Sequence, residues 1–259
     1  MKVALGQVVG APTDIAANLA LMERLAAEAG RRSADLLLLP ELFLSGYNIG
    51  ATVRELAEPL DGPSATRVGA IAAKAGLAIA YGYPERVPEG VYNSAAVLDR
   101  KGRAVANYRK THLWGDYERA QFLPGQALDL FELDGLRLGF MICYDIDFPE
   151  LARGLALAGA DALIALSATT APYPVVARHL IPARAYENRL FVLYANRAGE
   201  ESGLRYAGES CIAAPDGSIL ASCGQGEELA IGSVDLERYA AFRRDHRYEA
   251  HRRPELYRA

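Results

Sequence analysis

The feature of this chain that most constrains its fold is a set of apolar runs, each of strand length, in which apolar and polar residues do not alternate. Residues 35–40, 136–142 and 162–166 contain three such runs. Strands of this composition are buried on both faces, as in sheets that helices cover. Helical patterns at residues 15–29 and 149–158 can provide that cover. We therefore expect an α/β protein.

Further elements complete this pattern along the whole chain. The sequence predicts strands at 2–7, 78–83, 92–98, 104–108, 128–133 and 190–195, helices at 63–76 and 175–187, and three short antiparallel strands between 208 and 234. No linker, composition break or fixed-period repeat interrupts them. We expect one domain over residues 1–259, with a C-terminal arm from about residue 237.

Composition and charge narrow the possible partners. The formal net charge of −4 and the pI near 5.7 argue against nucleic acid or an anionic membrane as the main partner, because both attract a clustered positive field. The three cysteines are widely spaced, which argues against a disulfide framework and favours a reducing compartment. The first residues form a strand pattern, and no apolar run reaches the roughly 18 residues of a membrane span. We expect a cytoplasmic protein.

The basic tail is the one exception to this charge pattern. Residues 243–247 and 251–253 are rich in arginine and histidine, but acidic and aromatic residues are interleaved with them. Binding of nucleic acid is one interpretation of this composition. An arm that packs on a neighbouring subunit is the interpretation we favour.

Cys143 lies directly after the apolar run 136–142, and Pro149 opens a helix after a short acidic connector. The thiol therefore lies at the carboxyl end of a strand, where reaction sites of α/β sheets gather and backbone N–H groups are free. A buried structural cysteine is the alternative interpretation. Only partners elsewhere in the chain can exclude it.

Two charged residues occupy equivalent positions after other predicted strands. Glu41 follows the run 35–40, and Lys110 follows the strand at 104–108. Taken alone, Glu41 could serve as a structural hydrogen-bonding group and Lys110 as a surface charge. If the strands share one pair of sheets, both side chains converge with Cys143.

Other common site types are missing from the sequence. The four histidines lack metal-ligand spacing, and there is no Cys-x-x-Cys pair. Phosphate-binding and dinucleotide-binding glycine motifs are absent, as is the Gly-x-Ser-x-Gly elbow of serine hydrolases. We therefore expect no metal and no organic cofactor, and the remaining candidates are a glutamate, a lysine and a cysteine.

These three residue types together support thiol catalysis. A free thiol has a pKa of about 8.5, so it needs a nearby ammonium to favour thiolate and a base to take its proton. In this hypothesis Cys143 is the nucleophile and Glu41 the base. Attack on a carbonyl or nitrile carbon places negative charge on oxygen or nitrogen, which Lys110 and the backbone N–H of Tyr144 could stabilise.

Three stretches around these residues resemble the signatures of the nitrilase superfamily of carbon–nitrogen hydrolases. They are residues 40–47, 108–113 and 142–150. The resemblance implies a four-layer α-β-β-α sandwich, usually in a homodimer or larger homo-oligomer, with a Glu-Lys-Cys triad at Glu41, Lys110 and Cys143. It also implies a second glutamate near the site, which Glu118 matches; a surface carboxylate is the alternative for Glu118.

The residues after the cysteine distinguish branches of this superfamily. Nitrilases usually have Cys-Trp-Glu, whereas Cys143-Tyr144-Asp145 is similar to aliphatic amidases and carbamoyl hydrolases. Residues 45–50, 81–86 and 183–188 resemble bacterial amidases such as 5-aminopentanamidase. The resemblance implies hydrolysis of a small carboxamide to carboxylate and ammonia through a thioester. Nitrile hydrolysis, N-carbamoyl amine hydrolysis and a catalytically inactive interaction module remain as alternatives.

Several residues near the predicted strand ends are candidates for the wall of a substrate pocket. They are Tyr47, Trp114, Thr169, Thr170 and Tyr173. Core packing or simple surface exposure is the alternative for each of them. Arg184 and Glu187 are expected to form a structural pair rather than to contact the substrate.

Overall fold

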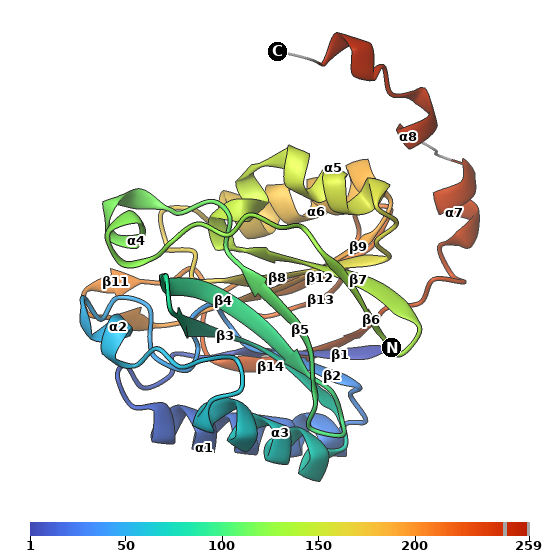
Figure 1. Cartoon of the computed structure of the whole chain (residues 1–259). Coiled ribbons are helices and arrows are strands. Elements are labelled where there is room, and N and C mark those ends of the chain that lie inside the picture. Colours follow the sequence, from blue (N-terminus) through green and yellow to red (C-terminus); the bar gives the residue numbers. More distant parts are fainter. Residues whose placement is uncertain (246–247, 258–259) are drawn as a thin grey trace.

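Two six-stranded sheets pack face to face and carry helices on their outer faces, as the computed structural model shows (Figure 1). The structure describes residues 1–245 and 248–257. The expected α/β class and the four-layer α-β-β-α sandwich are both confirmed. None of the helices in these residues combines the length and the apolar character that a membrane span requires.

The first sheet has the strand order β14-β1-β2-β3-β4-β5. Its strands are β1 (Lys2–Gln7), β2 (Leu36–Leu38), β3 (Ala78–Val87), β4 (Gly90–Leu98), β5 (Ala104–Arg109) and β14 (Glu228–Ser233). β1, β2 and β3 run parallel to one another, and the remaining neighbours are antiparallel. β1, β2 and β3 are buried over most of their length, and the unbroken apolar run at 35–40 predicts this for the central strand β2.

The second sheet has the order β13-β12-β9-β8-β7-β6. Its strands are β6 (Leu130–Leu133), β7 (Leu136–Ile142), β8 (Ala162–Ser167), β9 (Phe191–Asn196), β12 (Cys211–Ala213) and β13 (Ile219–Ser222). The three central strands β7, β8 and β9 are again parallel. A two-stranded ribbon of β10 (Glu200–Glu201) and β11 (Leu204–Arg205) lies outside both sheets.

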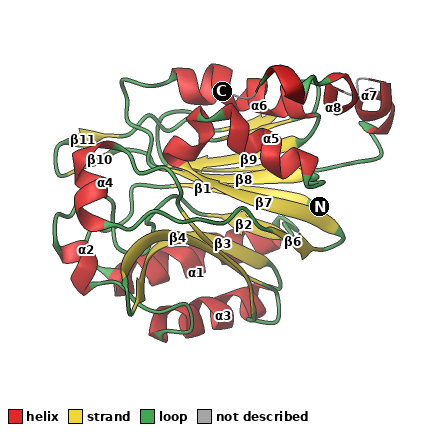
Figure 2. Ribbon diagram, turned by 45° about the horizontal axis from the view of Figure 1, so that its top comes forward, coloured by secondary structure: helices red, strands yellow, loops and turns green. Residues whose placement is uncertain are grey.

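Two helices cover the outer face of each sheet (Figure 2). α1 (Ile15–Arg31) and α3 (Pro63–Ala75) lie on the first sheet, and α5 (Pro149–Leu157) and α6 (Ile181–Asn188) lie on the second. The Asp14 carboxylate caps α1 by accepting the Ala17 N–H. These four helices lie close to their predicted positions, because each has an apolar face of helical period.

The layers are held by three apolar cores, of which the central one fills the space between the sheets. Leu38, Phe140 and Ile164 contribute to it from different strands. Burial of a side chain of this size stabilises the fold by about 1.5 to 3 kcal/mol. Apolar packing therefore fixes how the two sheets face each other, and with it the relative positions of their strand ends.

Some local elements differ from expectation. The helix predicted at 175–187 begins with a π-helical turn (Val176–Leu180) and continues as α6. Pro182 lacks an N–H, so the turn before it loses a normal helical hydrogen bond and widens. Two short helices, α2 (Thr52–Glu55) and α4 (Gly115–Gln121), lie where no helix was predicted.

The C-terminal segment leaves the body of the molecule as an arm (Figure 1). It contains α7 (Ala240–Asp245), α8 (Tyr248–His251) and a 3-10 turn (Pro254–Leu256), and Leu256 is exposed. His246 and Arg247 of the basic cluster lie outside the described residues. Packing of this arm on a neighbouring subunit stays a prediction.

Gly82 allows β3 to pass against the end of β2. A Cβ atom at this position would lie 2.3 Å from the backbone nitrogen of Leu42 and 2.7 Å from the Cα atom of Glu41. The Gly82 N–H also donates to the Pro40 carbonyl at 3.2 Å. The backbone around Glu41 is therefore supported by direct contact with β3.

We expect Gly82→Ala to lower the free energy of unfolding by about 1 to 3 kcal/mol, because the added methyl group overpacks backbone atoms. Urea denaturation measures this change. Gly226→Ala is the matched control, since a Cβ atom there meets nothing within 4 Å. Equal stabilities of the two variants would contradict the prediction.

Candidate active site

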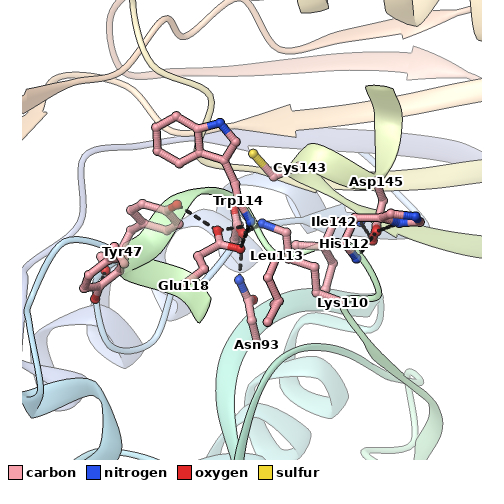
Figure 3. A network of polar contacts seen from close by, with 12 residues as sticks. Tyr47, Asn93, Lys110, His112, Leu113, Trp114, Glu118, Ile142, Cys143 and Asp145 are labelled. Carbon is pink, nitrogen blue, oxygen red and sulfur yellow. Dashed lines mark hydrogen bonds and ion pairs between the residues drawn. The ribbon is translucent and has the colours of Figure 1, made fainter. Parts of the chain in front are cut away.

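Residues that follow strands of both sheets come together at one end of the sandwich. Glu41 follows β2, Lys110 follows β5 and Cys143 follows β7. Figure 3 shows Lys110, Glu118, Asn93 and Tyr47 converging, with the Cys143 sulfur near Trp114. Because both sheets present these strand ends on the same side, residues far apart in the sequence form one site.

Lys110 is the centre of this group. Its Nζ atom donates to Oε1 of Glu41 and to Oε1 of Glu118, both at 2.7 Å, and all three side chains are fully buried. Burial acts to lower the pKa of Lys110. The negative charges of Glu118 and Glu41 together outweigh this effect and hold the pKa well above its ordinary value. Lys110 therefore remains an ammonium group.

Glu41 has one oxygen held and one oxygen free. Oε1 accepts from Lys110 Nζ and from Asn93 Nδ2, each at 2.7 Å. Oε2 is buried and has no hydrogen-bond partner among the described residues. Burial raises the pKa of Glu41, and the charge of Glu118 adds to this, although Lys110 opposes it. The free oxygen therefore belongs to a carboxylate that binds a proton more readily than usual.

Glu118 lies on α4 and accepts hydrogen bonds from several segments of the chain. Its Oε1 atom also accepts from the Tyr47 hydroxyl at 2.7 Å, and its Oε2 atom accepts from the Trp114 backbone N–H at 2.8 Å. The sequence match had placed a glutamate near the site without predicting α4. The sequence signal for α4 is the pair of acids Asp116 and Glu118 directly after Gly115, because acidic residues favour the first turn of a helix.

Cys143 begins a 3-10 turn (Cys143–Asp147) with a left-handed backbone, at φ +47°. Such a conformation is strained for a residue with a side chain. Burial, and then the charge of Glu41, raise the pKa of the thiol to about 12, while Lys110 opposes the shift. This differs from the expectation that Lys110 would favour thiolate. Lys110 contacts the two carboxylates, so the resting group is a neutral thiol.

Asp145 joins the segments that carry Cys143 and Lys110. One carboxylate oxygen accepts from the Ile142 N–H and the Tyr108 hydroxyl, both at 2.9 Å. The other accepts from the Thr111 hydroxyl at 2.8 Å and the His112 N–H at 2.9 Å. This fully buried carboxylate therefore fixes the turn of the thiol relative to β5.

Arg197 holds the backbone of Glu41 in place, as Asp145 does for the turn that begins at Cys143. This residue follows β9, is 1% exposed, and donates to the backbone carbonyls of Glu41 at 3.1 Å and Leu42 at 2.6 Å. Its charge is paired with Glu201 at 3.2 Å. The second sheet thus holds the backbone at the end of β2 in the first sheet. No local sequence pattern indicates this contact.

A cavity of about 260 Å³ opens above Cys143. The five residues proposed for the pocket wall all line it: Tyr47, Trp114, Thr169, Thr170 and Tyr173. Tyr144 lines it as well and is the second residue of the 3-10 turn, where N–H groups lack partners within the helix. The roles of these residues toward a substrate stay predictions.

Arg184 and Glu187 form the structural pair that the sequence predicted. Arg184 Nη1 lies 2.9 Å from Glu187 Oε1, and the guanidinium also donates to the Ile146 carbonyl at 2.9 Å and the Asp147 carbonyl at 3.2 Å. Arg184 therefore braces the turn that follows Cys143.

Comparisons with known proteins agree with this geometry. The family model described as "Carbon-nitrogen hydrolase" matches residues 2–244. The chain is similar to "Hydrolase in pqqF 5'region" of Pseudomonas protegens, with 52% identity over 99% of this chain and 90% of that protein. It is 38% identical to an (R)-stereoselective amidase of Pseudomonas sp, over 98% of this chain and 92% of that protein.

A less similar relative is named for a different activity. A protein named nitrilase from Pyrococcus abyssi is 37% identical over 85% of this chain and 84% of its own length. Among solved structures, the amidase from Nesterenkonia sp. AN1 in complex with acrylamide has a TM-score of 0.83 and 32% identity, over 97% of this chain and 95% of that one. The chain belongs to the carbon–nitrogen hydrolase family, of the nitrilase superfamily, and is an enzyme that acts on non-peptide C–N bonds.

Proposed function

We propose that this enzyme hydrolyses a small aliphatic carboxamide to a carboxylate and ammonia, with Cys143 as nucleophile. The observation that carries the proposal is the buried Glu41, with one oxygen bound by Lys110 and the other unpaired. The Nesterenkonia amidase supports the substrate class, since its solved forms include complexes with acrylamide and butyramide. Another form carries the acetamide moiety of fluoroacetamide on its active-site cysteine.

In the first step the thiol proton moves to Oε2 of Glu41 as sulfur attacks the amide carbon. When Glu41, Glu118 and Lys110 are all ionised, this buried group carries one net negative charge. A free thiolate at Cys143 would add a second negative charge to it. Transfer of the proton to Glu41 keeps the total charge constant. A raised pKa of Glu41 makes this carboxylate a better acceptor.

The attack places negative charge on the amide oxygen. Lys110 and the backbone N–H of Tyr144 are the donors proposed to stabilise it, and loss of one such donor in an enzyme costs about 3 to 4 kcal/mol. The C–N bond then breaks, and Glu41 returns its proton to the departing nitrogen. Ammonia leaves, and a thioester to Cys143 remains.

Water completes the reaction. Oε2 of Glu41 takes one proton from water as the water oxygen attacks the thioester carbon. The C–S bond breaks, Glu41 returns this proton to the departing sulfur, and the carboxylic acid leaves, so that the Cys143 thiol and the Glu41 carboxylate are both restored. Glu118 has a positioning role in this scheme, because it binds the same ammonium group as Glu41 and also holds Tyr47 at the cavity wall.

Hydrolysis of nitriles is a second candidate, which the similarity to the Pyrococcus abyssi protein favours. Butyramide and butyronitrile are a matched pair of substrates for a steady-state assay of ammonia release. We expect a higher kcat/KM for the amide. Equal or faster turnover of the nitrile would refute the amidase proposal, and butyl urea in the same assay tests carbamoyl hydrolysis.

Selective alkylation distinguishes a working site from an inactive interaction module. We expect iodoacetamide to modify Cys143 before Cys211 and Cys223, because the Cys143 thiol lines the cavity whereas the other two cysteines are buried. Intact mass followed by peptide mapping measures the order, and Cys143→Ala is the control. Uniform labelling of the three thiols would indicate a relic site.

Removal of the proposed base tests the mechanism directly. We expect Glu41→Gln to lower kcat by about 10²- to 10⁴-fold, the range for loss of general acid–base catalysis. Glu118→Gln should cost less, because it leaves the base in place. Glu150→Gln, at an exposed position at the start of α5, controls for the loss of one carboxylate. Wild-type activity in Glu41→Gln would eliminate Glu41 as the base.

The pH profile of kcat/KM should follow from the shifted groups. Glu41 must be unprotonated and its pKa is raised, so activity should fall with decreasing pH at a pH above the ordinary carboxylate value of about 4.3. The Cys143 pKa of about 12 predicts no second inflection near the ordinary thiol value of about 8.5. An inflection near pH 8.5 would contradict this assignment.

A further inference from the structure

Three hydroxyl groups of the second sheet gather beside the Cys143 sulfur. Ser167 is the last residue of β8, Thr169 follows it in the loop that lines the cavity, and Tyr194 lies on β9. All three side chains are buried. The mechanism proposed above uses none of these hydroxyls, although a buried polar group beside a reacting atom can act on its charge.

Thr169 is the member of this group that contacts the sulfur. Its Oγ1 atom lies 3.9 Å from Sγ of Cys143 and 2.7 Å from Oγ of Ser167. The contact with sulfur is long, as expected for a neutral thiol, which is a weak acceptor. Catalytic hydrogen bonds are often long before substrate binds and shorten in the transition state. Thr169 is therefore placed to donate to the sulfur when negative charge develops there.

Asn196 fixes the backbone of Thr169. Its Oδ1 atom accepts from the Thr169 N–H at 2.8 Å, and its Nδ2 atom donates to the Thr169 carbonyl at 3.2 Å and to the Gly208 carbonyl at 2.9 Å. Asn196 is also paired with Ser167 in the parallel register of β8 and β9. The Thr169 hydroxyl thus extends from a braced backbone, so little reorganisation is needed for it to act.

The protons of the three hydroxyls can all be directed toward the sulfur. The Tyr194 hydroxyl is buried and has no hydrogen-bond partner among the described residues. Burial raises the pKa of Tyr194, and the hydroxyls of Thr169 and Ser167 oppose this effect. Each hydroxyl carries one proton, so a Ser167 that donates to Thr169 leaves the Thr169 proton for the sulfur.

Lys110 is poorly placed to stabilise the sulfur as an anion, because its ammonium group is bound by Glu41 and Glu118. Burial and the charge of Glu41 raise the pKa of the Cys143 thiol, whereas Lys110 and the Ser167 hydroxyl lower it. The hydroxyls act on the sulfur without adding a charge to the buried group. They are therefore suited to a sulfur that is neutral at rest and briefly negative during the reaction.

We propose that Thr169 is a further catalytic residue, whose hydroxyl donates a hydrogen bond to the Cys143 sulfur as the C–S bond of the thioester breaks. Ser167 and Tyr194 are positioning residues behind it. This inference rests on the proposed amidase function and adds a donor for the departing sulfur. The electron pair of the C–S bond passes to sulfur, Glu41 supplies the proton, and Thr169 keeps its own proton throughout.

The reactivity of the thiol tests this contact without any amide substrate. Methyl methanethiosulfonate is a small, uncharged reagent that thiolates attack, and intact mass at one fixed pH follows its reaction with Cys143. We expect Thr169→Val to react about tenfold more slowly than the wild type, the effect of one lost hydrogen bond to a charged group. Thr169→Ser is the matched control, because it keeps the hydroxyl, and should react like the wild type.

Steady-state kinetics with butyramide test the step at which Thr169 acts. We expect Thr169→Val to lower kcat about tenfold and kcat/KM much less, because loss of the donor slows the second half of the reaction. Intact mass of samples quenched during turnover should show more thioester on Cys143 in this variant than in the wild type. An equal fall in kcat and kcat/KM without extra thioester would indicate a structural role and overturn the proposal.

The two experiments separate this inference from the proposed reaction. Wild-type thiol reactivity in Thr169→Val, or an equal loss in Thr169→Ser, would overturn the role of the hydroxyl even if amides are hydrolysed. Slower thiol reaction of Thr169→Val in a protein that hydrolyses no amide would instead overturn the amidase proposal and leave the contact with sulfur standing. Tyr194→Phe should slow the thiol reaction less than Thr169→Val does, and a larger effect would contradict the assignment of Thr169 as the direct donor.

Discussion

The interaction on which this site depends is the fully buried group of Lys110 with Glu41 and Glu118. Ions removed from water are severely destabilising unless their partners are held in accurate positions. The molecule meets this condition with contacts from both sheets: Asp145 fixes the turn of the thiol, and Arg197 holds the backbone of Glu41. Much of the polar interior near the strand ends therefore serves to keep three charges in register.

This arrangement also changes how the thiol is activated. A lysine beside a cysteine suggests a preformed thiolate, but Lys110 is occupied by two carboxylates, and the surroundings of Cys143 favour the neutral form. In the mechanism proposed above, the reactivity of Cys143 then depends on proton transfer to Glu41 at the moment of attack. A resting site of this kind leaves the sulfur less reactive toward stray electrophiles than a thiolate would be, because the nucleophile is the thiolate.

The sequence was informative wherever the physical cause is local. Unbroken apolar runs predicted the buried strands, an apolar face of helical period predicted α1, and a proline at the first helical position predicted the starts of α3 and α5. The glutamate, lysine and cysteine that follow three strands marked the site. The contact of Arg197 with Glu41 joins residues 156 positions apart, and no local pattern encodes it. α4 was missed because it is a single short helix whose side chains are mostly polar. The lack of a hydrogen-bond partner for Oε2 of Glu41 depends on how the surrounding side chains pack, which only the structure reveals.

The left-handed backbone of Cys143 has a consequence for how such a protein can change. A residue with a side chain in this conformation costs about 1 to 3 kcal/mol, which glycine avoids. Selection for thermal robustness alone would therefore act against a residue on which the proposed chemistry depends. Replacement of Cys143 by glycine would thus relieve backbone strain while it removes the proposed nucleophile, so stability and activity make opposite demands on this position.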